Sequence, residues 1–151
     1  MTKTIAIVAT FDTKGAECAY LRDEIVRMGA QALLIDIGVV DDAAIDVDIT
    51  NAEIATKGGT ELAELRQNPS REIASEVMIR GATDTMLDLI TSHKVDGMIS
   101  LGGTQGTNNC CRVMAALPYG FPKVMLSTMA SGDTSGYVGI KDITMMFSVS
   151  D

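Results

Sequence analysis

Aromatic residues are scarce in this sequence. It has no tryptophan, and aromatic residues make up only 4% of its 151 residues. Hydrophobic residues nevertheless make up 46% of the chain, and ten of them are methionines. Its core must therefore be built from aliphatic side chains and methionine. A chain of this length can bury such a core as a single domain.

Positive charge is also scarce. The chain has 12 lysines and arginines against 20 acidic residues, which gives a formal net charge of −8. Nucleic acids and anionic membranes need a basic protein surface, so we expect neither as a partner. A phosphorylated small molecule is compatible with this charge, because backbone N–H groups can supply a local positive field.

Long apolar runs are missing as well. No run of 18 apolar residues occurs, so no transmembrane helix is expected. The opening residues, MTKTIAIVATFD, lead directly into a strand pattern and lack the features of a signal peptide. These absences lead us to expect a cytoplasmic protein.

Cysteine and histidine are too few for several kinds of site. Two of the three cysteines, Cys110 and Cys111, are adjacent and would form a strained disulfide, so we expect reduced thiols. The single histidine, His93, lies far from them in sequence. A zinc site and a Cys-His or Ser-His-Asp catalytic group are therefore not expected. We interpret the adjacent cysteines as packing residues.

The pattern of apolar residues predicts alternating strands and helices. Continuous apolar runs, typical of buried parallel strands, occur at residues 4–10, 32–37, 95–101 and 123–128. Helical spacing appears between these runs, most clearly at residues 16–28 and 69–93. Residues 138–149 have the pattern of one or two further strands, including an edge strand at the C-terminus. The order predicts an α/β fold, a three-layer Rossmann-like parallel sheet with helices on both faces.

Several local signals refine this prediction. Thr50 and Glu53 have the spacing of a capping box. Gly81 interrupts the long helix, which predicts that another element packs closely there. Either Thr104 or Thr107 is predicted to cap the helix after the third strand. No helix follows the last strand to cover it, so we expect residues 1–151 to be part of a longer chain.

The glycine-rich loop GGTQGT, residues 102–107, is the most distinctive motif. Its glycines allow consecutive N–H groups to converge on an anion, and the following helix adds its positive N-terminus. The motif is neither a P-loop nor the dinucleotide-binding fingerprint. Taken alone, it fits a tight turn as well as it fits an anion site.

Two other loops are predicted to lie at the same edge of the sheet. FDTKG, at residues 11–15, offers a lysine for phosphate and an aspartate for Mg²⁺. A small polar cluster follows the fourth strand, at Ser127, Thr128, Ser131 and Gly132. Each of these alone is typical of an ordinary solvated loop. Because the carboxyl ends of parallel strands share one edge, the three loops together favour a ligand site.

Four sequence blocks resemble the UPF0261 family. They are TFDTKGAE, DGMISLGGTQGT, LPYGFPKVMLSTMASGD and YVGIKDITMMFSVSD, and they occur in order along the whole chain. This family includes the inhibitory N-terminal region of the tomato mosaic virus resistance protein Tm-1 and bacterial Tm-1-like ATP-binding proteins. The resemblance implies a two-lobed α/β protein, of which this chain is the first lobe and the second lobe is absent. It also implies ATP binding and assembly into homo-oligomers.

The resemblance also implies a set of binding residues. ATP phosphates would be held by the backbone N–H groups between Gly103 and Thr107, and Mg²⁺ would be held by Asp12. The residues that the resemblance carries over are Gly102, Gly103, Thr104, Gly106 and Thr107, with Asp12, Thr13 and Lys14 facing them. The loop residues named on residue type and position alone complete the candidate set: Thr10, Ser127, Thr128, Ser131 and Gly132. No catalytic residue is assigned. Two alternatives stay open: an enzyme that acts on a small metabolite between two lobes through Asp12, Lys14 and Ser131, and a regulatory protein-interaction module.

Overall fold

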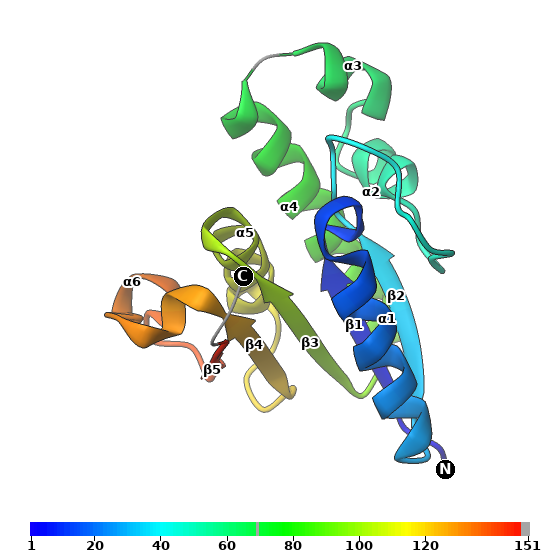
Figure 1. Ribbon diagram of the computed structural model, residues 1–151, viewed down its shortest axis with the longest axis vertical. Helices are drawn as coiled ribbons and strands as arrows, with labels where there is room; N and C mark the ends of the chain where they lie inside the picture. Colours follow the sequence, from blue (N-terminus) through cyan, green and yellow to red (C-terminus); the bar gives the residue numbers. More distant parts are fainter. Residues whose placement is uncertain (69, 149–151) are drawn as a thin grey trace.

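The computed structural model describes residues 1–68 and 70–148, which form a five-stranded parallel sheet flanked by helices (Figure 1). The strands are β1 (Thr4–Ala9), β2 (Gln31–Asp36), β3 (Gly97–Gly102), β4 (Lys123–Ser127) and β5 (Thr144–Phe147). Their order across the sheet is β2-β1-β3-β4-β5, and every pair is parallel. The predicted three-layer, Rossmann-like α/β architecture is confirmed.

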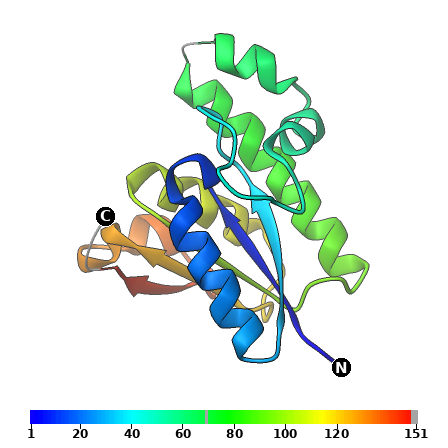
Figure 2. The ribbon, with the colours of Figure 1, turned by 45° about the vertical axis from the view of Figure 1, so that its right-hand side comes forward.

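The longer helices cover the two faces unequally. Helix α1 (Phe11–Arg27) packs on one face, where Phe11, Cys18 and Ile25 join a cluster with residues of β1 and β2. Helices α4 (Arg71–Thr91) and α5 (Thr104–Ala116) pack on the other face in a larger cluster. Figure 2 shows α1 in front of the sheet with α4 and α5 behind it. As expected from the composition, the larger cluster is aliphatic and rich in methionine, including Met78, Met86, Met98, Met114 and Met125.

Four short helical segments occupy the connections. Helices α2 (Asn51–Lys57) and α3 (Leu62–Gln67) lie in the excursion between β2 and α4. A 3-10 turn, η1 (Thr128–Ser131), and helix α6 (Ser135–Val138) join β4 to β5. No described helix is both long and apolar enough to cross a membrane.

Two predicted local features are confirmed. Thr50 accepts a hydrogen bond from the N–H of Glu53, whose carboxylate accepts one from the N–H of Thr50, which completes the capping box. Gly81 of α4 lies directly against α2. A Cβ atom at this position would lie 1.9 Å from the carbonyl oxygen of Ile54, so only glycine permits this close approach.

Three predictions about local structure were wrong. Residues 11–15 are the first turns of α1, with a non-helical kink at Lys14 (φ −124°, ψ 21°), and are not a loop before the helix. The segment after β4, predicted as a loop, contains η1 and α6. Of the one or two strands predicted at residues 138–149, β5 forms and is the predicted edge strand, whereas residues 138–140 form no strand, because residues 138–143 make a helix end and a turn; residue 149 lies outside the described residues.

The sheet order fixes where a ligand site can form. The chain moves from β1 to β2 in one direction and then crosses β1 to reach β3, so strand order reverses between β1 and β3. Ligands of open parallel sheets bind beyond the carboxyl ends of the strands at such a reversal. Here that point lies between the start of α1 and the start of α5.

Candidate functional site

A cavity of about 650 Å³ opens at the point where strand order reverses. Its walls come from the first turns of α1, α4 and α5 and from the excursion after β2. The lining residues are Thr10, Asp12, Thr13, Lys14, Ile37, Val39, Val40, Leu65, Arg66, Asn68, Ser70, Arg71, Ala74, Ser75, Met78, Gly103, Thr104, Gln105, Gly106 and Asn109. Two of the three predicted loops therefore meet at one cavity.

The glycine-rich loop forms one wall, and its helix begins without a side-chain cap. Gly103 is the N-cap residue of α5, so the prediction that Thr104 or Thr107 caps this helix was wrong. Thr107 lies one turn inside the helix, where its N–H donates to the carbonyl oxygen of Gly103 (2.8 Å). The preceding N–H groups, at Thr104, Gln105 and Gly106, donate to no carbonyl or side chain of the described residues. Three donors are therefore available beside the cavity at the positive end of a helix.

The side chain of Thr107 is fully buried and joins the glycine-rich loop to the ends of the strands. Its hydroxyl donates to the carbonyl oxygen of Gly102 (3.3 Å) and shares a short hydrogen bond with the Ser127 hydroxyl of β4. The Ser127 oxygen in turn accepts from the N–H of Met129 (3.0 Å). These hydroxyls link the ends of β3 and β4 and the first turn of α5.

The start of α1 forms the opposite wall. The buried Asp36, at the end of β2, accepts hydrogen bonds from the N–H groups of Phe11 (3.1 Å) and Gly38 (2.8 Å). Burial raises the pKa of Asp36 above its ordinary value, and these two hydrogen bonds oppose that effect. Asp36 therefore fixes the β1–α1 junction against the loop after β2 and does not line the cavity.

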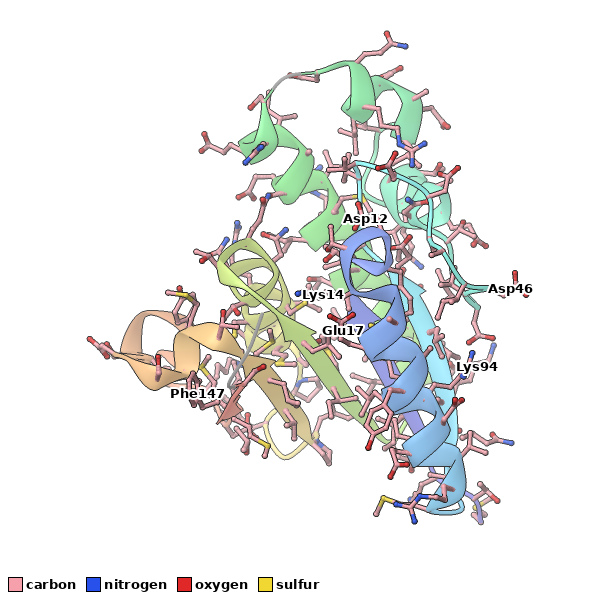
Figure 3. The ribbon with its side chains drawn as sticks, in the orientation of Figure 1. Asp12, Lys14, Glu17, Asp46, Lys94 and Phe147 are labelled. Carbon is pink, nitrogen blue, oxygen red and sulfur yellow. The ribbon has the colours of Figure 1, made fainter. Side chains whose placement is uncertain are left out.

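Asp12 carries an oxygen that lacks a partner. Its Oδ2 accepts a hydrogen bond from the N–H of Asp41 (3.3 Å), whereas its Oδ1 is buried without a hydrogen-bond partner in the described part of the chain. The carboxylate packs against Gly38, where a Cβ atom would lie 2.8 Å from Asp12 Cγ. Figure 3 shows Asp12 at the start of α1, with Lys14 extending from the same helix toward β3 and α5. Lys14 also forms an ion pair with Glu17 (3.8 Å).

The third wall was not foreseen from the sequence. Ser70 caps α4 by accepting a hydrogen bond from the N–H of Ile73 (3.3 Å), and Arg71 follows at the first helical position. Arg66 of α3 donates to the carbonyl oxygen of Val39 (2.9 Å) and to Asp42 (2.7 Å). Two arginines thus line the cavity. Neither the sequence of the excursion nor the start of α4 gave a signal that Arg66 and Arg71 line this cavity.

The remaining predicted residues lie elsewhere. Thr128 and Gly102 line a second cavity on the α1 side of the sheet. Ser131 is exposed, and its hydroxyl donates to the carbonyl oxygen of Thr128 (3.4 Å); Gly132 ends η1. The structure thus brings Asp12 and Lys14 together at the cavity, and Ser131 is not among its lining residues.

The cysteines are buried in the packing. Burial raises the pKa of Cys18 and Cys110 to about 12 and that of Cys111 to about 11. All three thiols are free. Thiols with such pKa values are almost fully protonated at neutral pH, so they are poor nucleophiles. Among residues 1–68 and 70–148, no three His, Cys, Asp or Glu side chains gather in an arrangement suited to a metal ion.

Together these features define an open, doubly wound α/β domain with a polar cavity at its reversal point. The chain belongs to the UPF0261 family, because the sequence profile of the "Uncharacterised protein family (UPF0261) N-terminal domain" matches residues 3–151. A UPF0261 protein of Clostridium tetani is 44% identical over 151 residues, which are 100% of this chain and 37% of that protein.

Two other relatives extend the comparison. A UPF0261 protein of Mesorhizobium japonicum is 40% identical over 151 residues, which cover 99% of this chain and 36% of the relative. The ToMV resistance protein Tm-1 of Solanum lycopersicum is 28% identical over 164 residues, which cover 95% of this chain and 21% of that protein. The chain therefore spans little more than a third of the bacterial relatives described here.

Proposed function

We propose that the cavity at the reversal point binds a phosphorylated small molecule, with ATP as the leading candidate. The observation that carries this proposal is the uncapped start of α5. The N–H groups of Thr104, Gln105 and Gly106 have no acceptor among the described residues, and they lie beside a cavity that the starts of α1 and α4 also line. Helix N-termini favour anions, and phosphate oxygens are strong acceptors for such N–H groups.

The charges and size of the cavity support the same ligand class. Lys14, Arg66 and Arg71 line it, so positive side chains gather here in a chain whose net charge is −8. Small-molecule sites typically have volumes of about 300–1,000 Å³. The cavity, at about 650 Å³, has room for a nucleotide. Val39 and Val40, which are the more accessible of its apolar residues, offer a surface for the uncharged part of such a ligand.

ATP is favoured over other phosphorylated molecules by the family resemblance. Mg²⁺, which commonly accompanies ATP, uses one or two carboxylates together with phosphate oxygens and water. Asp12 fits this requirement, since its Oδ1 is buried without a partner among the described residues and its side chain lines the cavity. Asp36 does not fit, because its Oδ1 already accepts two backbone hydrogen bonds at the buried end of β2. We therefore assign Asp12 alone as the carboxylate that would hold Mg²⁺.

Isothermal titration calorimetry on the full-length protein tests the proposal. ATP should bind in the presence of Mg²⁺, and adenosine, which lacks phosphate, should bind much more weakly. Replacing Arg71 by Gln should weaken ATP binding without affecting adenosine, because only the phosphates interact with the guanidinium. Absence of heat at millimolar ATP, or equal affinities for ATP and adenosine, would contradict a phosphate site.

A further inference from the structure

The face of the sheet that carries α1 is only partly covered. Parallel sheets are normally buried on both faces, because their strands are apolar on both sides. Here α1 packs on β1 and β2 and reaches β3, where Ile99 and Leu101 pack against its cluster, whereas no described helix packs on the same face of β4 and β5. Figure 1 shows β3 between α1 and β4, with β5 on the far side of β4 from α1. Met146 of β5 is 59% exposed.

Side-chain alternation shows that this open face is apolar. Met98, Met125 and Met145 point toward α5, since they belong to or pack against its cluster. Their neighbours along the strands must therefore point the other way. Leu126 of β4 therefore points toward the open face, and Leu101 of β3, which packs against the α1 cluster, lies at its border. With Tyr20 and Leu21 of α1, these two leucines line a cavity of about 470 Å³, which we call the α1–β4 groove.

We propose that the α1–β4 groove is the docking site for the polypeptide that follows this domain in the same protein. The family profile describes an N-terminal domain, and the Clostridium tetani relative is 37% covered by this chain, so most of that protein lies outside the match. The last described residue, Ser148, lines the groove, and its N–H donates to the carbonyl oxygen of Ser127 (3.1 Å). The described part of the chain therefore ends at the groove itself.

The chemistry of the groove fits an amphipathic helix. Its floor is formed by leucines of two neighbouring parallel strands, and Tyr20, which is 69% exposed, stands at one side. A helix parallel to α1 would bury these side chains as α4 and α5 do on the other face. Such a helix would also contact Lys14, which lines both the groove and the cavity at the reversal point. The docked segment would thus contact the ligand site through Lys14, from the α1 side of the sheet.

Cysteine labelling of the full-length protein tests the proposal. Tyr20→Cys places a thiol at the groove, and Val26→Cys places one on the same helix outside it; the native side chains are 69% and 56% exposed. The native thiols react slowly because they are buried. If a segment covers the groove, the Tyr20→Cys variant should react with a maleimide at least about tenfold more slowly than the Val26→Cys variant, because only accessible thiolates react.

Two further measurements make the result decisive. Protection of the introduced thiol in the Tyr20→Cys variant should persist when the full-length protein is diluted to a concentration at which light scattering shows a monomer. Protection should be lost when the chain is shortened to residues 1–151, provided that circular dichroism shows the helical content retained. Equal labelling rates for the two full-length variants would overturn the proposal. Protection that disappears on dilution would also overturn it, since a second copy would then be the occupant.

Discussion

Replacing Gly103 by Asp should separate the stability of α5 from ligand binding. Gly103 is the N-cap residue, with an extended backbone (φ −82°, ψ −152°) that any residue can adopt. An aspartate there would accept hydrogen bonds from the N–H groups that are proposed to hold phosphate. The substitution therefore fills the anion site with a carboxylate that belongs to the protein itself.

The expected effect on stability is a small increase. Aspartate is a better N-cap than glycine by a few tenths of a kcal/mol. Its charge at the helix N-terminus adds about 0.3–1 kcal/mol. For a domain of this size, the melting temperature should rise by about 2 °C. Differential scanning calorimetry of the full-length protein without ligand measures this change.

The expected effect on affinity has the opposite sign. Two unit negative charges about 4 Å apart repel each other by about 4 kcal/mol at an effective dielectric constant of about 20. Solvent weakens this repulsion, but even a third of it lowers the affinity for ATP about tenfold. Calorimetric titration measures the loss.

The matched control is Gly136→Asp. Gly136 lies in α6, and a Cβ atom there meets no other atom within 4 Å, so the same charge is added away from the cavity. This control should leave ATP affinity unchanged. The reasoning would be refuted by a Gly103→Asp protein that is more stable yet binds ATP as tightly as the unaltered protein.

Three other substitutions test separate parts of the structure. Gly38→Ala should displace the carboxylate of Asp12, which lies 2.8 Å from the added Cβ atom. The effect of Mg²⁺ on ATP affinity should therefore fall, with little change in melting temperature, and calorimetric titration of ATP with and without Mg²⁺ measures it. Gly81→Ala should lower the free energy of unfolding by about 3 kcal/mol in urea, because its Cβ atom meets backbone of α2, whereas Gly136→Ala should not. Hydrogen bonds from the buried lysine of β4 and from the N–H of Gly120 lower the pKa of Asp142. Its ionised form therefore stabilises the fold above about pH 4, and this contribution is lost as the pH falls further; urea unfolding between about pH 2 and pH 7 should show a weaker acid dependence in Asp142→Asn.

The sheet and the long helices could be predicted because their signals are local. Strands buried on both faces appear as continuous apolar runs, and β1 to β4 lie within about two residues of their predicted bounds. The capping box at Thr50 and the close packing at Gly81 depend on only a few residues, and both are confirmed. Strand parallelism alone predicted that three polar segments meet at one edge, and residues from two of them, 11–15 and 102–107, do line one cavity, whereas the third, after β4, does not line it.

Other features depended on tertiary contacts. The helix α1 begins earlier than expected because Phe11 is buried in the core and its N–H bonds to Asp36, which no pattern within FDTKG reveals. Thr107 was a reasonable cap by residue type, but its hydroxyl is engaged by the partners behind the loop. Arg66 and Arg71 were missed because their approach to the cavity depends on how the excursion between β2 and α4 folds back and sets the start of α4.

The buried hydroxyls behind the glycine-rich loop bear on how the site responds to a ligand. Because Thr107 and Ser127 connect α5 to the ends of two central strands, the donors at the start of α5 are held in place before any ligand arrives. Binding there requires little loss of conformational entropy from this wall. The wall that carries Val40 and Arg66 is held largely within the excursion itself, since Arg66 donates to the carbonyl oxygen of Val39 and to Asp42, and Val40 is 78% exposed. Ordering on binding should therefore concentrate in the excursion, so that one wall acts as a fixed template and the other as the part that adapts to the ligand.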